Sequence, residues 1–249
     1  MRQPKLIVLM FHRIHDMSQQ FDKHKFEAYL NYLREKFTFC VPQEPLQLTP
    51  LNICLTFDDA YCDFYYYVYP LLKQYNLKAI LGVSTDYIVD ATTVDKATRL
   101  SVPYPKGMDS SVWLDKVPFC TWQELTEMNQ SGHVIMASHS ASHPHMTDSS
   151  CELEREIIES KNILEHKLGT PIDYFIYPYG DYNRKIHKLV RQHYRWDFRI
   201  GSASNRNWPS NNPLYRIDAE KFWPQNLPFT DKNLRKMNTK YWMNRLRGK

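Results

Sequence analysis

The sequence predicts an α/β protein built on a parallel β-sheet, with the size of a single α/β barrel. Short apolar runs rich in β-branched residues alternate with longer segments of helical periodicity, which is typical of repeated strand–helix units. The chain has 249 residues and is 43% apolar, enough for one sizeable buried core. We therefore expect a single domain over residues 1–249.

Seven apolar runs are the candidate strands, at residues 6–11, 53–57, 79–83, 134–138, 174–177, 198–200 and 214–217. Helical spacing relates Phe26, Leu30, Leu33 and Phe37, and it recurs among the apolar residues of 153–168. These positions predict two helices with one apolar face each.

Capping residues mark the ends of further helices. Thr121 with Glu124 three residues later forms a capping box, and Asn183 suits the N-cap of a helix that runs to about residue 194. Gly169 suits the end of the helix that begins near residue 153. Pro70 is expected early in its helix or at a kink.

One connection, residues 84–120, is much longer than the others and contains several prolines. Loops of this length are commonly functional lids or mobile segments. The alternative is a surface excursion without a role.

Composition narrows the class of protein. A net charge of +5 gives little support for nucleic-acid binding, and five cysteines without paired CxxC spacing predict reduced thiols. The apolar run at 6–11 is too short for a signal peptide, and no run reaches the roughly 18 residues of a membrane helix, so we expect a cytoplasmic protein. A basic helix at about 231–247 could contact an anionic membrane or pack on the domain.

The segment 55–60, Leu-Thr-Phe-Asp-Asp-Ala, ends an apolar strand in two adjacent carboxylates, Asp58 and Asp59. Carboxylates this close repel, and a metal or a proton usually relieves the repulsion. His139 and His143 have a spacing at which two imidazoles can chelate one ion. The alternative is that the aspartates cap a turn and the histidines lie on an exposed surface.

In a parallel barrel, polar residues at the carboxyl ends of the strands converge on one rim. The residues expected there are His12, Asp58, Asp59, His139, Pro178, Tyr179, Arg216 and Asp218. A divalent ion held by Asp59, His139 and His143 would leave positions open for water and a substrate carbonyl, with Asp58 as general base. We therefore predict a metal-dependent hydrolase that contacts its substrate through Pro178, Tyr179 and Arg216.

Three motifs resemble those of the polysaccharide deacetylases with a NodB-homology domain, carbohydrate esterase family four. Thr-Phe-Asp-Asp-Ala at 56–60 resembles the TFDD(G/A) motif, His-Ser-Ala-Ser-His at 139–143 resembles H(S/T)xxH, and Phe-Ile-Tyr-Pro-Tyr-Gly at 175–180 resembles FRxPYG. His12 resembles the histidine of the YH motif in a subgroup that includes poly-N-acetylglucosamine deacetylases. The match extends from Leu6 to about Asp218.

The resemblance implies a distorted (β/α) barrel of about seven parallel strands that removes the N-acetyl group of an amino sugar in a polysaccharide, an oligosaccharide or a lipid-linked sugar. It implies a divalent ion, zinc first, with cobalt and nickel as alternatives. It also implies Asp58 as the catalytic base, Asp59, His139 and His143 as metal ligands, and the Tyr179 backbone amide as part of the oxyanion site.

Two departures from the family pattern affect the mechanism. Ile176 stands where the third motif has arginine, and Arg216 is a candidate replacement. The late histidine motif that supplies the general acid has no counterpart, because no histidine follows His193. We expect His12 to protonate the leaving amine, with His145 or a water as alternatives.

These departures keep two other hypotheses open. The same fold could remove a formyl group or cleave another small amide. A chain lacking the arginine and the acid could also be a carbohydrate-binding protein without turnover. The sequence leaves the oligomeric state open.

Overall fold

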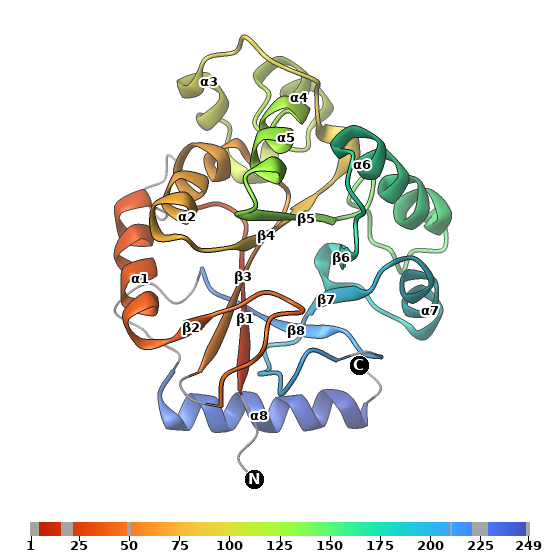
Figure 1. Cartoon of the computed structure of the whole chain (residues 1–249). Coiled ribbons are helices and arrows are strands. Elements are labelled where there is room, and N and C mark those ends of the chain that lie inside the picture. The colour runs from red at the N-terminus through yellow and green to blue at the C-terminus, as the bar shows by residue number, and fades with distance from the viewer. Residues whose placement is uncertain (1–4, 16–21, 49–50, 210, 221–228, 248–249) are drawn as a thin grey trace.

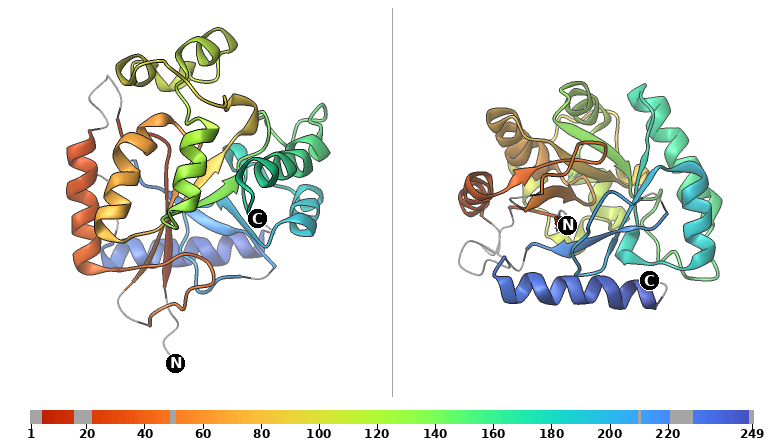
Figure 2. Two further views of the ribbon diagram at one scale, coloured as in Figure 1. Left: turned by 45° about the horizontal axis from the view of Figure 1, so that its top comes forward. Right: turned by 60° about the horizontal axis from the view of Figure 1, so that its bottom comes forward.

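Seven parallel strands close into a barrel, and helices surround it (Figures 1 and 2). The computed structural model describes residues 5–15, 22–48, 51–209, 211–220 and 229–247. The barrel strands are β1 (Leu6–Phe11), β3 (Asn52–Phe57), β4 (Ala79–Val83), β5 (Val134–Ser138), β6 (Tyr174–Ile176), β7 (Trp196–Ile200) and β8 (Leu214–Asp218). Because β1 pairs with both β3 and β8, the sheet closes, which confirms the predicted seven-stranded barrel.

A two-residue strand, β2 (Thr38–Phe39), adds to the start of β3. The pairing of β1 with β3 runs without a break from Leu6↔Asn52 to Phe11↔Phe57, so the two strands end at the same level. The Asp58 amide continues this ladder to the Phe11 carbonyl at 2.8 Å. The register therefore places the residues that follow β1 and β3 side by side on the carboxyl rim.

Apolar residues form two clusters, one inside the barrel and one between the barrel and the helices. Every barrel strand contributes to the inner cluster, through Leu6, Val8, Cys54, Ile80, Ala137, Ile176, Phe198 and Leu214. Since side chains alternate along a strand, Thr56 and Asp58 share the inward face with Cys54. The five cysteines are free thiols, as expected.

The outer layer consists of helices that follow the strands (Figure 1). They are α1 (Lys23–Lys36), α2 (Tyr69–Tyr75), α5 (Trp122–Gln130), α6 (Ser160–Leu168), α7 (Arg184–His193) and α8 (Asp231–Leu246). Thr121 and Glu124 form the predicted capping box, Asn183 caps α7, and Gly169 ends α6 in the left-handed conformation. Pro70 lies in α2 directly after a π-helical turn, η1 (Phe64–Val68), whose wider spacing accommodates the missing N–H.

The long connection between β4 and α5 is folded rather than featureless. It contains η2 (Thr85–Tyr87), α3 (Lys96–Leu100), η3 (Tyr104–Lys106) and α4 (Ser110–Lys116), seen at the top of Figure 1. We call residues 84–120 the insertion. Arg99, 2% exposed, donates to the carbonyls of Val117 and Phe119 at 2.9 and 2.7 Å and pairs with Glu124 at 2.7 and 2.8 Å. This buried arginine ties α3 to the C-terminal end of the insertion and to α5.

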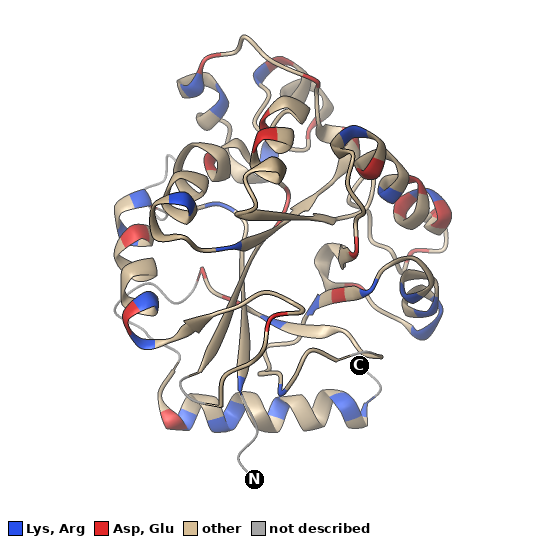
Figure 3. Cartoon of the chain, viewed as in Figure 1, with Lys and Arg blue, Asp and Glu red and all other residues tan. Residues whose placement is uncertain are grey.

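The C-terminal helix α8 packs on the domain through Met237, while Trp242, Met243 and Leu246 are exposed. Lysines and arginines recur along its length (Figure 3). Within the described residues, none of the helices has the length and apolar character needed to span a bilayer.

Candidate active site

Asp59, His139 and His143 meet at the carboxyl ends of β3 and β5. Their ligand atoms all lie within 4.8 Å of one another. Asp59 Oδ1 is 3.5 Å from Nε2 of both histidines, and the two imidazole centroids are 4.7 Å apart. The structure thus brings together the three predicted metal ligands.

The chemistry of this group fits a divalent cation. Asp59 Oδ1 is buried and has no hydrogen-bond partner among the described residues, although it faces both histidines. Burial lowers the pKa of His139 and of His143 to about 4, so both imidazoles are neutral at neutral pH. Two neutral imidazoles and one carboxylate are a common zinc ligand set, and a cation here would satisfy the orphaned oxygen.

A hydrogen bond to the backbone of β6 fixes the tautomer of His139. Its Nδ1 lies 2.9 Å from the Ile176 carbonyl, which can only accept, so Nδ1 carries the proton and Nε2 presents its lone pair to Asp59. Gly82 on β4 makes room for this ring, because a Cβ there would lie 3.0 Å from the Ile176 side chain and 3.3 Å from the His139 Cβ.

Buried Glu156 holds the turn between the two histidines. Its Oε2 accepts from the amides of Ala141 and Ser142 at 2.9 and 2.8 Å, and its Oε1 accepts from the Ser142 hydroxyl at 2.8 Å. His143 has a left-handed backbone, with φ of 56°. Backbone strain of this kind persists when the surrounding structure enforces it, as Glu156 does here.

Asp58 is paired with an arginine from β8. Arg216 Nη1 and Nη2 donate to the two oxygens of Asp58 at 2.6 and 2.8 Å, and Nη1 lies 3.3 Å from the Thr56 hydroxyl. Burial disfavours the charged carboxylate, but Arg216, with smaller contributions from His139 and His12, more than offsets it and holds the pKa of Asp58 well below its ordinary value. Asp58 is therefore an ionised base inside the rim.

His12 faces Asp58 from the end of β1. Its Nε2 is 3.8 Å from Asp58 Oδ2, and its Nδ1 is 3.1 Å from Glu220 Oε1, which also accepts from the His12 amide at 2.6 Å. Burial lowers the pKa of His12, but Glu220, Asp58 and Asp59 outweigh it and raise the pKa to about 9. A protonated imidazole thus lies beside the base.

The third motif forms a tight turn, η5 (Pro178–Gly180), after β6. Tyr179 has a φ of 55° and is 53% exposed; its ring lies 4.6 Å from that of His143 and stacks on that of His145 at 4.0 Å. His145 is bound to Asp181 at 3.1 Å with 57% of its side chain exposed. Tyr179 therefore borders the site, while His145 lies on its outer side.

Two predictions about substrate contact are corrected. Arg216 is fully buried and its guanidinium is bound to Asp58, so it cannot contact a substrate; this pairing is the one expected of a replacement for the missing third-motif arginine. Pro178 is buried and shapes the turn. Both corrections arise because strand-end position in a sequence does not show whether a side chain points inward or outward.

The structure also adds three residues that the sequence analysis missed. Glu220 orients His12, Tyr104 donates to Asp59 Oδ2 at 3.2 Å, and Glu156 holds the histidine turn. Glu156 lies on the predicted helix after the motif, and its buried position within an apolar pattern could have signalled a role. Glu220 and Tyr104 have no spacing relation to the motifs.

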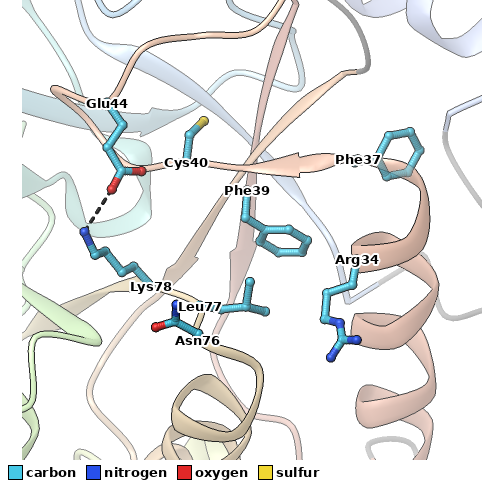
Figure 4. A pocket seen from close by; sticks show the side chains of 8 residues that line it. All are labelled: Arg34, Phe37, Phe39, Cys40, Glu44, Asn76, Leu77 and Lys78. Carbon is cyan, nitrogen blue, oxygen red and sulfur yellow. Dashed lines mark hydrogen bonds and ion pairs between the residues drawn. The ribbon is translucent and has the colours of Figure 1, made fainter.

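A surface pocket of about 420 Å³ lies elsewhere, between α1, β2 and the turn before β4 (Figure 4). Its lining comprises Arg34, Phe37, Phe39, Cys40, Glu44, Asn76, Leu77 and Lys78. Lys78 and Glu44 neutralise each other in an ion pair of 2.9 Å. Since β2 pairs with the start of β3 and Asn76 to Lys78 precede β4, the pocket lies at the amino ends of the strands, away from the carboxyl rim.

Comparison with known proteins agrees with this geometry. The profile of the family described as polysaccharide deacetylase matches residues 48–194. YxkH of Bacillus subtilis, named as a polysaccharide deacetylase, is 27% identical over 198 residues, which are 76% of this chain and 61% of YxkH. The chain thus spans less than two thirds of the length of this relative.

Two solved structures share the fold. The deacetylase PplD of Streptococcus pyogenes, solved in complex with acetate, superposes with a TM-score of 0.69 at 24% identity, covering 94% of this chain and 98% of PplD. IcaB of Ammonifex degensii gives a TM-score of 0.68 at 20% identity, with 97% of each chain covered. At these identities the two structures support the barrel architecture.

Proposed function

Since the chain belongs to the polysaccharide deacetylase family, we propose that it hydrolyses the N-acetyl group of an N-acetylated amino sugar at a divalent metal centre. Water adds to the amide carbonyl carbon, the C–N bond breaks, and acetate and a free amine are released. Asp59, His139 and His143 would hold the ion, with zinc as the first candidate and cobalt and nickel as alternatives.

Asp58 takes the role of general base. Its pairing with Arg216 keeps the carboxylate ionised and fixes its plane, so one oxygen points toward the neighbouring ligands: Asp58 Oδ2 lies 3.9 Å from His139 Nε2. An ion held by Asp59, His139 and His143 would polarise the amide carbonyl and lower the pKa of a nearby water. Asp58 then accepts the proton that this water loses on attack.

His12 takes the role of general acid. Glu220 holds Nδ1, which leaves the Nε2 proton directed at the region that Asp58 also faces. That proton passes to the amine as the C–N bond breaks. The backbone amide of Tyr179, whose ring lies 4.6 Å from that of His143, would support the oxyanion.

The observation that carries the proposal is the joint presence of an ionised base and a protonated imidazole next to the Asp59–His139–His143 group. The motifs lack both the arginine that pairs with the base and the general acid. Arg216 on β8 is the candidate for the first, and His12 after β1, held by Glu220, is the candidate for the second. This arrangement favours a hydrolase over a carbohydrate-binding protein without turnover.

Acetate release from N-acetylglucosamine oligomers, measured after zinc loading, tests the proposal. We expect release by the unaltered protein and a loss of about 10²-fold or more in Asp58→Asn, the typical contribution of a general base, with metal still bound. Formate release from an N-formyl sugar, without acetate release from its acetyl counterpart, would favour a deformylase. Glycan binding without turnover under zinc, cobalt and nickel would favour a binding protein.

Membrane contact and cellular location are also part of the proposal. The exposed Trp242, Met243 and Leu246 with the basic residues of α8 support peripheral contact with an anionic membrane, as predicted from the sequence. The cytoplasmic location expected from the sequence likewise stays a prediction.

A further inference from the structure

We propose that Tyr104, on the insertion between β4 and α5, is a positioning residue of the metal centre: its hydroxyl holds Oδ2 of Asp59 so that Oδ1 faces the two imidazoles. This inference rests on the proposed function, because it takes Asp59, His139 and His143 as the metal ligands.

The two oxygens of Asp59 have different surroundings. Oδ2 accepts a hydrogen bond of 3.2 Å from the Tyr104 hydroxyl. Oδ1 has no such donor among the described residues and lies 3.5 Å from Nε2 of both His139 and His143. One oxygen is thus bound to the protein, and the other is left for the ion.

This division matches the way His139 is held. There the Ile176 carbonyl occupies Nδ1 and leaves Nε2 for the ion. An aspartate carboxylate can rotate about its Cβ–Cγ bond and bind a cation through either oxygen or both. A donor fixed on one oxygen removes that freedom, so the ligand is oriented before the ion arrives.

The fold holds the backbone of Tyr104 in place from the barrel side. The Tyr61 hydroxyl, close after β3, donates to the Tyr104 carbonyl at 3.0 Å. Arg13, the neighbour of His12, donates to the carbonyls of Leu100 and Val102 at 3.2 and 2.5 Å, and its guanidinium lies 5.0 Å from the Tyr61 ring centroid.

Close packing at Gly107 completes this support, because a Cβ there would collide with the Tyr61 hydroxyl. The insertion therefore packs on Tyr61 at Tyr104 and Gly107, and it is bound to Arg13 just before Tyr104. The Tyr104 ring also contacts the rings of Tyr61 and His12, with centroids 5.4 and 5.5 Å away.

Tyr104 is not an ordinary core aromatic, because it remains 39% exposed while its hydroxyl is turned inward to a buried carboxylate. A residue kept for packing would bury its ring and direct its hydroxyl to water. The orientation seen here is the one that a support for a metal ligand requires.

The test is the zinc affinity of the full chain, measured by competition with a chromogenic chelator, in the unaltered protein and in Tyr104→Phe. We expect Tyr104→Phe to weaken zinc binding about 10- to 100-fold, the usual effect of removing an outer partner of a metal ligand. Tyr66→Phe is the matched control: it removes a hydroxyl 2.8 Å from Arg99 Nη1 in the same anchoring network but away from the ligands, and should leave the affinity unchanged.

Thermal unfolding of the metal-free proteins shows whether each variant is folded. Unchanged affinity in folded Tyr104→Phe overturns the inference, and so does an equal loss in Tyr66→Phe, since packing of the insertion would then set the affinity. Failure of the unaltered protein to bind zinc, cobalt or nickel would instead overturn the proposed function.

Discussion

At Asp58, a carboxylate with 3% of its surface exposed keeps its charge because Arg216 approaches it from inside the barrel with two hydrogen bonds. A buried charge without its partner is costly, so the pair acts as one unit. The arginine comes from β8 rather than from the third motif, where Ile176 fills the inner cluster instead.

Arg216→Met should therefore abolish most of the activity while the metal ligands stay in place. Without the guanidinium, the pKa of buried Asp58 rises, and the base is partly protonated at neutral pH. We expect kcat to fall about 10²-fold or more and the free energy of unfolding to fall by about 3–5 kcal/mol. Steady-state kinetics, denaturant unfolding and metal analysis measure these effects. Full activity in a folded Arg216→Met protein would contradict the role given to the pair.

His12 gives a second prediction, in the pH dependence of kcat/KM. Its pKa, about 9, is raised by Glu220, Asp58 and Asp59; its ring contacts that of Tyr104, and His143 is close enough to interact with it electrostatically. The acid works while protonated, so activity falls as pH rises through this pKa. A bound cation lowers the value, and the prediction therefore concerns the shift between two metal-loaded proteins.

In Glu220→Gln the loss of one negative charge lowers the pKa of His12, so the alkaline limb of the profile should move to lower pH. His145→Gln removes an exposed imidazole outside the predicted acid position and should leave that limb unchanged. A change in the alkaline limb in His145→Gln, with none in Glu220→Gln, would show that His145 rather than His12 is the general acid.

At the scale of elements, periodicity and capping predicted all seven barrel strands and the main helices to within a few residues. Side chains alternate between the two faces of β3, so Cys54, Thr56 and Asp58 all point into the barrel and lead from the inner cluster to the site. Sequence could not reveal how the insertion folds, because its contacts are made by single buried side chains, Arg13 and Arg99, with backbone carbonyls far along the chain.

The tryptophans in loops also show that the sequence does not reveal how loop side chains pack. The sequence places Trp113, Trp208 and Trp223 in proline-rich loops, where an exposed tryptophan could stack on a sugar ring. Trp113 and Trp208 are partly buried: Trp113 packs on Tyr87 with centroids 5.8 Å apart, and Trp208 donates to the Glu44 carbonyl at 2.8 Å. Trp208 thus lies near the start of the strands, away from the rim. The third candidate, Trp223, is outside the described residues.

Arg99 allows the anchoring of the insertion to be tested. Arg99→Met leaves Glu124 and two carbonyls without their donor, so we expect the free energy of unfolding to fall by about 3–5 kcal/mol. Because Arg99 touches none of the reacting groups, kcat of the folded protein should change far less than in Arg216→Met. Denaturant unfolding measures the change in the free energy of unfolding, and steady-state kinetics at low temperature measure kcat. A loss of kcat equal to that of Arg216→Met would show that Arg99 acts on the chemistry.

At the scale of the molecule, closure of the barrel pairs the first strand with the last. Because β8 pairs with β1, residues from the last strand and from the segment after it reach the residues that follow β1 and β3. The proposed base and acid, Asp58 and His12, gather at this junction with their partners Arg216 and Glu220. The histidine ligands approach from β5 across the rim. Local motifs predicted the ligands, and the missing third-motif arginine pointed to Arg216, whereas Glu220, the partner of His12, depends on closure and became visible only in the fold.

The metal centre is the central claim, and the metal content of the purified protein tests it most directly. After incubation with zinc and removal of unbound ions, elemental analysis should find close to one zinc per chain. The double variant His139→Ala, His143→Ala should retain almost none. No bound metal in the unaltered protein after incubation with zinc, cobalt or nickel, or equal amounts in the protein and the double variant, would contradict the assignment of Asp59, His139 and His143.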